Sequence, residues 1–195
     1  APKIAKKIKA GQFIILRVNE TGERIPLTVA DKDEFAGIIT IIFQIVGKST
    51  ALLNSLNTGD FIKDVVGPLG KPAEIDKIGT VITVGGGTGV AILYHVAKAF
   101  KEKGNRVIGI IGAKEHELLI LEEEMQAVCD ELVVTTDDGS YGERGFVTGP
   151  LEKYLNERHD IKLVYAIGPI PMMKYVCSLT KKHNMPTMVS LNPIM

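Results

Sequence analysis

The stretch TVITVGGGTGVAILYHVAKAFKEKG, residues 80–104, constrains the fold more than any other part of the chain. Apolar and β-branched residues predict a strand that runs directly into a glycine cluster. Apolar residues at helical spacing follow, and Gly104 provides a helix stop. The strand-like segments that come later, each separated from the next by a helical pattern, are RVIGIIG, ELVVTT, KLVYAIG and TMVSL. This alternation predicts a parallel sheet with helices on both faces.

The helical segments between those strands are predicted from their apolar periodicity. They are ELLILEEEMQAV, with Leu118, Leu121, Met125 and Val128 on one face, then LEKYLNER and MMKYVCSLTKKH. Pro171 suits the first position of the last of these helices, because a helix start does not need the missing N–H.

The first part of the chain has a different pattern. It consists mainly of short strand-like segments separated by turns that contain Gly or Pro, and these segments are QFIILRV, RIPLTVA, GIITIIFQIV and DFIKDVVGP. Closely spaced strands of this kind predict a small antiparallel barrel or sandwich. We therefore expect two domains, an antiparallel β domain over residues 1–76 and an α/β domain over residues 77–195.

The glycine cluster VGGGTG, residues 84–89, lies between a predicted strand and a predicted helix. In that context glycines let the backbone approach a pyrophosphate, which the helix N-terminus stabilises. The full G-x-G-x-x-G fingerprint would need a glycine where Val90 stands, and an ordinary glycine-rich turn remains an alternative. A second candidate segment is IGPIPMM, residues 167–173, because the carboxyl ends of parallel strands are where open α/β sheets bind ligands.

The Gly-Lys-Ser-Thr run at residues 47–50 resembles the end of a P-loop. A P-loop needs a second glycine where Ile42 stands, so an ATPase is disfavoured. Ser49 is expected to cap a short helix, whose free N–H groups could receive a phosphate from another ligand. A plain capped helix is the alternative.

The preference between NADH and NADPH stays open at this point. The residue that contacts the adenosine ribose is expected about 20 residues beyond the glycines. The sequence there offers Lys114, which could pair with a 2′-phosphate, beside Glu115, which would repel one.

Composition excludes several classes of function. The 23 basic and 23 acidic residues balance, which argues against a nucleic-acid partner. Cys129 and Cys177 lie far apart without a CxxC spacing, and the four histidines are scattered, so no disulfide framework or metal site is predicted and a reducing, cytoplasmic setting is expected. No apolar run approaches the roughly twenty residues of a membrane span.

Together the two halves resemble the ferredoxin-reductase-like flavoproteins, in which a flavin-binding antiparallel barrel precedes a nicotinamide-binding α/β domain. Within that family they resemble the electron-transfer subunits of dihydroorotate dehydrogenase and the small (alpha) subunits of ferredoxin:NADP oxidoreductase, also called sulfide dehydrogenase. The segments that carry the likeness are ERIPLTVAD, VGKSTALL, GDFIKDVVGPLGKP, VGGGTGVA, TDDGSYGERGFVT, IGPIPMM and VSLNPIM.

The resemblance implies two cofactor-binding regions. For FAD, Arg24 would pair with the pyrophosphate, Pro26, Leu27 and Thr28 would lie along the isoalloxazine edge, and the helix start at Gly47, Lys48, Ser49 and Thr50 would receive the same pyrophosphate. For the nicotinamide dinucleotide the implied contacts are Gly85, Gly86, Gly87, Thr88, Gly89, Asp138, Ser140, Tyr141, Gly168, Pro169, Met172 and Met173. Hydride transfer from nicotinamide to flavin needs no protein acid, base or nucleophile, so no catalytic residue is predicted. The two cysteines are interpreted as buried thiols in helices.

The function that the resemblance implies is electron transfer between NAD(P)H and ferredoxin or a larger flavin or iron–sulfur partner subunit. Service to a dihydroorotate dehydrogenase is one alternative, and a nucleotide-binding regulatory module without redox turnover is another. Members of the group usually carry a two-iron, two-sulfur cluster in a cysteine-rich stretch after a segment like SLNPIM. Two cysteines cannot supply four thiolates. The cluster is therefore expected only in a longer native subunit, with both termini of this chain incomplete.

Overall fold

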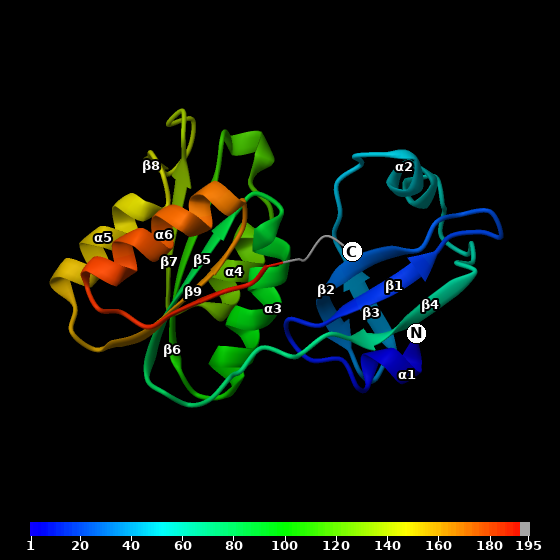
Figure 1. Ribbon diagram of the computed structural model, residues 1–195, viewed down its shortest axis with the longest axis horizontal. Coiled ribbons are helices and arrows are strands. Elements are labelled where there is room, and N and C mark those ends of the chain that lie inside the picture. Colours follow the sequence, from blue (N-terminus) through cyan, green and yellow to red (C-terminus); the bar gives the residue numbers. More distant parts are fainter. Residues whose placement is uncertain (192–195) are drawn as a thin grey trace. The chain divides into compact units, whose positions relative to one another are not determined.

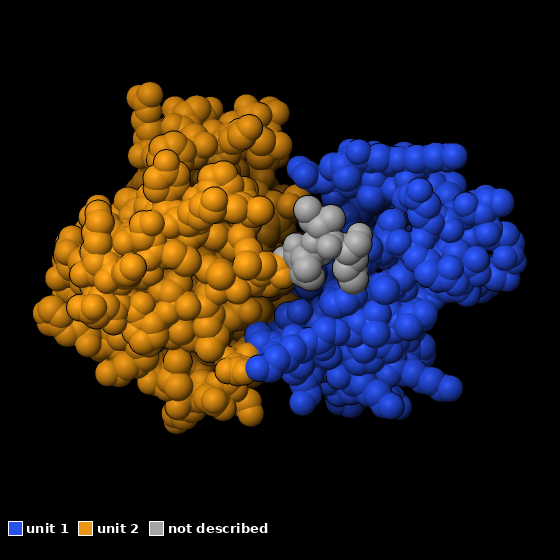
Figure 2. All heavy atoms as spheres, in the orientation of Figure 1, with its two compact units in different colours: residues 1–73 blue, residues 74–195 orange. Residues whose placement is uncertain are grey.

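The computed structural model describes residues 1–191, so the last four residues of the VSLNPIM segment lie outside it. The described chain divides into two compact units, one of residues 1–73 and the other beginning at Glu74 (Figure 2). Each unit has its own core. The functions expected for residues 1–76 and 77–195 stay predictions.

Unit 1 is built on an antiparallel sheet. Its helices and strands are α1 (Pro2–Ala5), β1 (Phe13–Arg17), β2 (Ile25–Asp33), β3 (Ile38–Ile41), α2 (Lys48–Asn54) and β4 (Asp64–Leu69). The strand order is β3-β2-β1-β4, and each neighbouring pair is antiparallel, which confirms the predicted class of this half.

Alternate residues of β1 form the core of unit 1. Ile14 and Leu16 are fully buried, whereas the residues between them are only half-buried, as expected for a sheet with one covered face. Val29 of β2 and Leu53 of α2 join the same cluster. Burial of Leu53 therefore fixes α2 to the sheet.

Unit 1 departs from the prediction at three places. Residues 2–5 form a short helix where none was predicted, and the strand predicted over residues 37–46 ends at Ile41. Helix α2 is capped by Gly47, not by Ser49, because the Thr50 hydroxyl accepts the Gly47 N–H at 3.1 Å and closes the first turn. Ser49 lies inside that turn.

Unit 2 is a parallel sheet with helices on both faces, as predicted, but it has six strands, one of which, β8, the sequence did not suggest. Its strands are β5 (Thr80–Gly86), β6 (Arg106–Ala113), β7 (Glu131–Thr136), β8 (Glu143–Arg144), β9 (Ile161–Ile167) and β10 (Thr187–Val189). Its helices are α3 (Gly89–Glu102), the 3-10 helix η1 (His116–Leu118), α4 (Glu122–Val128), α5 (Thr148–Glu157) and α6 (Ile170–Lys182). In Figure 1, α3 and α4 cover one face of the sheet, and α5 and α6 cover the other.

The strand order of unit 2 is β10-β9-β5-β6-β7-β8. The chain first builds the sheet in one direction from β5 and then returns to the other side of β5 with β9. Every residue of β5 is buried, because the strand is covered on both faces. The order therefore reverses between β5 and β9, and the loops that leave these strands flank a topological switch point.

The predicted helix over ELLILEEEMQAV is shorter than expected. The chain forms a 3-10 turn at His116–Leu118, and α4 begins only at Glu122, after Leu121 in a left-handed conformation. Leu118 is consequently 46% exposed, and Met125 supplies the buried contact of α4. The apolar pattern predicted a helix here, but it did not predict where the helix begins, because no capping residue marks the first turn.

The two cysteines differ in their surroundings. Cys129 directly follows α4, and burial raises the pKa of its thiol to about 12. Cys177 lies in α6 and is only half-buried, so its interpretation as a buried thiol was wrong. Residues 1–191 contain no helix long and apolar enough to cross a membrane and no group of three metal-ligating side chains.

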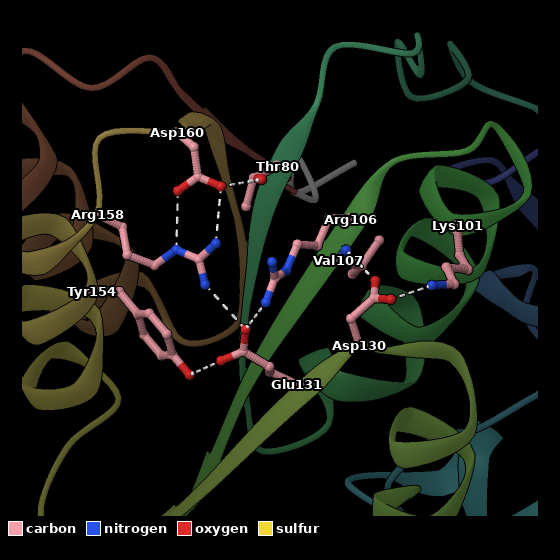
Figure 3. Close-up of polar contacts among 9 residues, drawn as sticks. All are labelled: Thr80, Lys101, Arg106, Val107, Asp130, Glu131, Tyr154, Arg158 and Asp160. Carbon is pink, nitrogen blue, oxygen red and sulfur yellow. Dashed lines mark hydrogen bonds and ion pairs between the residues drawn. The ribbon is translucent and has the colours of Figure 1, made fainter.

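A polar network ties together the amino ends of four strands of unit 2, as Figure 3 shows. Arg158, at the end of α5, donates from Nε and Nη2 to Asp160 at 3.0 and 2.9 Å and from Nη1 to Glu131 at 3.1 Å. Arg106 and the Tyr154 hydroxyl donate to the same Glu131 carboxylate, at 2.5 and 2.9 Å. The network therefore links β6, β7 and α5 to the residue that precedes β9.

Charge partners lower the pKa of the carboxylates in this network. Arg158, followed by the Thr80 hydroxyl, lowers the pKa of Asp160. Burial opposes ionisation of Glu131, but hydrogen bonds from Tyr154 and Arg106 outweigh it and lower its pKa. Such carboxylates stabilise the fold above their unfolded pKa and lose that effect as the pH falls through their folded pKa.

We expect Arg158→Ala to lower the melting temperature by about 4 °C at pH 7, since it removes bidentate pairing worth about 1 kcal/mol at a partly exposed site. The difference from the parent should shrink as the pH falls from about 4 through the lowered folded pKa values of Asp160 and Glu131, because over that range the unfolded chain binds protons that the folded parent does not. Lys153→Ala, an exposed substitution on the same helix, is the control. A pH-independent difference in thermal unfolding would contradict this account.

Candidate functional site

The loop between β5 and α3 carries the glycine cluster. Gly87 has a positive φ of 54°, and no atom lies within 4 Å of the position that a Cβ there would take. A ligand can therefore approach the backbone at Gly87 closely. Thr88, the next residue, is exposed and precedes the first turn of α3.

The loop between β9 and α6 packs directly against the glycine cluster. A Cβ at Gly89 would lie 2.7 Å from Gly168 Cα and 2.7 Å from the Ile167 carbonyl oxygen. A Cβ at Gly86 would lie 2.5 Å from Met172 Sδ. The two segments predicted to share a ligand therefore meet at the switch point, and only glycines allow this approach.

The departure from the G-x-G-x-x-G pattern also has an explanation here. The close contact that the third glycine normally provides is made by Gly89, one position earlier, against the β9–α6 loop. Val90 is 2% exposed and packs in the core of unit 2.

Two helix N-termini face this junction. Helices α3 and α6 begin next to the glycine loops, and neither has an acidic residue in its first turn. Unopposed helix dipoles favour a bound anion, so the junction can stabilise a pyrophosphate. Pro171 occupies the second position of α6, not the first as predicted, because the helix begins at Ile170.

The methionines of IGPIPMM have different positions. Met172 is half-buried and its side chain reaches Gly86 and Gly168. Met173 is 5% exposed and is a core residue. Pro169 is exposed beside the loop.

The loop between β7 and β8 holds the other predicted contacts of the dinucleotide. Asp138 Oδ1 accepts hydrogen bonds from the Ser140 N–H and hydroxyl at 2.9 and 2.7 Å, which lowers the pKa of Asp138. Ser140 Oγ in turn accepts the His116 N–H at 2.9 Å. The loop is therefore pinned to the segment that follows β6.

An aromatic pair that the sequence did not suggest lies at the same place. The rings of His116 and Tyr141 stack with their centroids 4.4 Å apart, and the Tyr141 hydroxyl donates to Glu122 at 2.8 Å. That hydrogen bond raises the pKa of Tyr141. Only the adjacency of β6 and β7 in the sheet could have indicated this pair.

Acidic residues dominate the carboxyl ends of β6 and β7. The Asp137 and Asp138 amides donate to the Ala113 and Lys114 carbonyls at 3.1 and 3.2 Å. Both aspartates therefore lie beside Lys114 and Glu115, and the exposed charges there are mostly negative.

Unit 1 brings its two predicted phosphate contacts close together. The Ser49 hydroxyl donates to Glu23 at 2.6 Å, which places the start of α2 beside the residue that precedes Arg24. Arg24 is 62% exposed and lies 3.8 Å from Asp64. No atom lies within 4 Å of the position of a Cβ at Gly47, so the α2 start has open space above it.

The remaining predicted flavin contacts lie at the start of β2. Pro26 is exposed, and Leu27 and Thr28 pair with Ile14 and Phe13 of β1. Lys48 is exposed at the first position of α2. The structure thus places every predicted residue of unit 1 on the β2 start or the α2 start, and their roles stay predictions.

An antiparallel unit followed by a parallel α/β unit with a glycine-lined switch point defines a ferredoxin-reductase-like oxidoreductase. The sequence model of the oxidoreductase NAD-binding domain matches residues 83–178. The fold also resembles the cytochrome b5 reductase domain of Ulva prolifera nitrate reductase, with a TM-score of 0.72 over 94% of this chain and 85% of that one, at 19% identity.

Proteins of higher sequence identity identify the family within this class. The chain is 45% identical, over its whole length and 68% of the relative, to a dihydroorotate dehydrogenase B (NAD⁺) electron transfer subunit homolog of Thermotoga maritima. It is 37% identical, over 91% of its length and 69% of the relative, to the corresponding electron transfer subunit of Streptococcus mutans. The whole of this chain also superposes on 70% of a chain from an NADH-dependent reduced ferredoxin-NADP oxidoreductase, which was solved for insight into flavin-based electron bifurcation. The TM-score is 0.93 and the sequence identity is 43%. This chain therefore belongs to the family of dihydroorotate dehydrogenase B electron transfer subunits, which are ferredoxin-reductase-like flavoproteins.

Proposed function

We propose that this chain forms the FAD-binding and NAD(P)H-binding part of an electron-transfer subunit, which moves electrons between NAD(P)H and ferredoxin or a larger flavin or iron–sulfur partner subunit. The observation that carries the proposal is the contact between the Gly85–Gly89 loop and the Gly168 loop at the switch point of unit 2. Membership of a flavoprotein family supports the proposal that the subunit binds FAD. Residues 1–76 are proposed as the FAD-binding domain and residues 77–195 as the NAD(P)-binding domain.

The residues of each unit fit the groups proposed for them. In unit 2, the open backbone at Gly87 and the first turns of α3 and α6 suit a pyrophosphate. In unit 1, the exposed guanidinium of Arg24 is suited to bidentate pairing with a phosphate, and Leu27 and Thr28 offer a partly apolar strand surface. When bound, FAD supplies the ability to accept two electrons as a hydride and to release them singly. The protein's role is to bind and orient the reacting groups and to exclude water.

The partner of the subunit is proposed from its relatives. Electron transfer subunits named for dihydroorotate dehydrogenase B imply a catalytic partner, and the relative from ferredoxin-NADP oxidoreductase makes ferredoxin the other candidate. A two-iron, two-sulfur cluster would need ligands from a segment outside this chain, since Cys129 and Cys177 cannot supply four thiolates. That cluster and a cytoplasmic location stay predictions.

Anaerobic reduction tests the proposed function. The purified protein, reconstituted with FAD, should show the yellow flavin spectrum, and NADH should bleach it. Reoxidation by ferredoxin, or by a dihydroorotate dehydrogenase catalytic subunit, would distinguish the two partners. A colourless protein that binds no FAD would support a regulatory nucleotide-binding module instead.

We propose NADH as the preferred donor. The negative charges of Glu115, Asp137 and Asp138 lie together at the carboxyl ends of β6 and β7, where the adenosine ribose is expected, and they would repel a 2′-phosphate. Lys114 and Arg144, which pairs with Thr136 next to Asp137, are the opposing charges among these neighbours.

Neutralising two of these acids should shift the preference toward NADPH. We expect Glu115→Gln combined with Asp137→Asn to raise the NADPH-to-NADH ratio of kcat/KM about three- to tenfold, since each removes repulsion worth a fraction of a kcal/mol at an exposed site. The control is Glu102→Gln with Glu157→Gln, which makes the same change in net charge at the carboxyl-terminal ends of α3 and α5, the opposite edge of the sheet. An unchanged ratio, or an equal shift in the control, would contradict the assignment.

A further inference from the structure

The connection between the two units is held at both ends. On the side of unit 1, the Ala73 N–H donates to the Ala10 carbonyl at 2.9 Å, and Gly11 lies against Ala73. On the side of unit 2, residues 76–79 lack regular secondary structure and are exposed, yet they are fixed by one buried side chain, that of Asn105.

Asn105 uses the full hydrogen-bonding capacity of its amide. Its Oδ1 accepts the N–H groups of Ile78 and Gly79 at 2.8 and 3.1 Å. Its Nδ2 donates to the carbonyls of Asp76 and Phe100, both at 2.9 Å. An amide offers two donors and two acceptor positions, so this side chain has no capacity left for a ligand.

Other contacts hold the same segment on the turn between α3 and β6. The Lys77 side chain lies over Gly104, at the distance of an ordinary van der Waals contact from a Cβ placed there. The Arg106 N–H donates to the Gly79 carbonyl at 3.1 Å. Residues 76–79 are therefore a part of unit 2, although they contain no helix or strand.

We propose that Asn105 is a positioning residue for electron transfer, because it keeps the tether between the units short. This inference rests on the proposed function, in which a nicotinamide held by unit 2 reduces a flavin held by unit 1. With residues 76–79 fixed, the chain spans three residue steps from Ala73 to Asp76, a maximal reach of about 11 Å. If they were released, the tether would extend to Thr80, and the reach would grow to about 25 Å.

A longer tether lowers the effective concentration of one unit at the other. With a dependence on length of about the −3/2 power, an increase from three to seven steps predicts a fall of about three- to fourfold. The fall should affect the rate of flavin reduction at saturating NADH. It should not affect the affinity for NADH, because Asn105 lies at the amino edge of the sheet, away from the glycine loops.

Two variants test the inference in the FAD-loaded protein. The first inserts Gly-Ser-Gly-Ser between Ala73 and Glu74, which adds four residues to the tether and leaves every buried side chain in place. The second is Asn105→Ala, with the exposed Asn156→Ala on α5 as its matched control. Each is measured for FAD content, NADH dissociation constant and rate of flavin reduction in a single turnover.

We expect the insertion and Asn105→Ala each to slow reduction at saturating NADH by about threefold or more with an unchanged NADH dissociation constant. Asn105→Ala should also let trypsin cleave after the already exposed Lys77, because the backbone there is no longer fixed, whereas the parent and Asn156→Ala resist cleavage there. Unchanged reduction by the insertion variant overturns the inference, as does slower reduction in Asn105→Ala that is explained by weaker NADH binding alone. If Asn105→Ala does not fold, the insertion decides the question. If the parent itself is not reduced by NADH, the proposed function fails, which is a separate result.

Discussion

Gly89→Ala is expected to reduce the rate of flavin reduction by NADH on the order of a hundredfold. The added methyl group would lie 2.7 Å from backbone atoms of the β9–α6 loop, and backbone cannot rotate away as a side chain does. Unit 2 would have to separate the two loops, at a cost of about 1–3 kcal/mol. A shift of about 1 Å in the groups that orient a substrate is sufficient for a loss of this size.

The effect of Gly89→Ala should be confined to unit 2. FAD content should stay at the parent level, because the proposed flavin contacts lie in unit 1. Gly149→Ala is the matched control, since no atom lies within 4 Å of a Cβ at that position in α5 and alanine is the better helix former. A Gly89→Ala protein with the parent's reduction rate and melting temperature would disprove the packing argument.

Arg24→Ala is expected to weaken FAD binding by about 10- to 100-fold, the equivalent of one or two charge-assisted hydrogen bonds to phosphate. The apoprotein should keep its melting temperature. Arg24 is 62% exposed and its only charge contact among residues 1–191, with Asp64 at 3.8 Å, is long. Fluorescence titration of the apoprotein with FAD measures the affinity.

Two further variants sharpen the test of Arg24. Arg24→Lys keeps the charge but loses the planar fork, so it should recover only part of the affinity. Lys63→Ala removes another surface cation of unit 1, paired with Glu20 at 2.5 Å, and should leave FAD binding unchanged. Equal affinity in Arg24→Ala and the parent would remove Arg24 from the flavin site.

The fold was predictable where the pattern is local and repeated. Each predicted strand of unit 2 except the last is followed by a helical pattern with its own apolar face, and the loop after TVITV carries glycines that only a tight turn and a close contact require. The strand order was not predicted from the sequence, so the switch point between β5 and β9 became visible only in the structure. The antiparallel class of unit 1 followed from the short spacing of its strands.

The predictions were wrong or incomplete where the local structure depends on residues that are distant in the sequence, or on a side chain that hydrogen-bonds to the backbone. The start of α2 depends on the Thr50 hydroxyl, which selects Gly47 as the cap over the better capping residue Ser49. Helix α4 starts late because Leu121 adopts a left-handed conformation that no propensity favours. The stacking of His116 on Tyr141 joins the 3-10 helix that follows β6 to the loop between β7 and β8.

The residues around the proposed site were predictable to different degrees. The two glycine loops could be singled out because glycine has few other reasons to occur in clusters, although their contacts with a dinucleotide stay predictions. Asn105 was not suggested, since a single asparagine after a helix stop is typical of an ordinary turn. Its role depends on four partners, and three of them come from a segment more than twenty residues earlier in the chain.

The ion-pair network of Figure 3 and the glycine loops occupy opposite edges of one sheet. Substitutions that reinforce Arg158, Glu131 and their neighbours can therefore raise heat tolerance without touching the edge proposed to bind the dinucleotide. A designer who wants a thermostable relative, or one retuned for a different donor, can work on the two tasks independently.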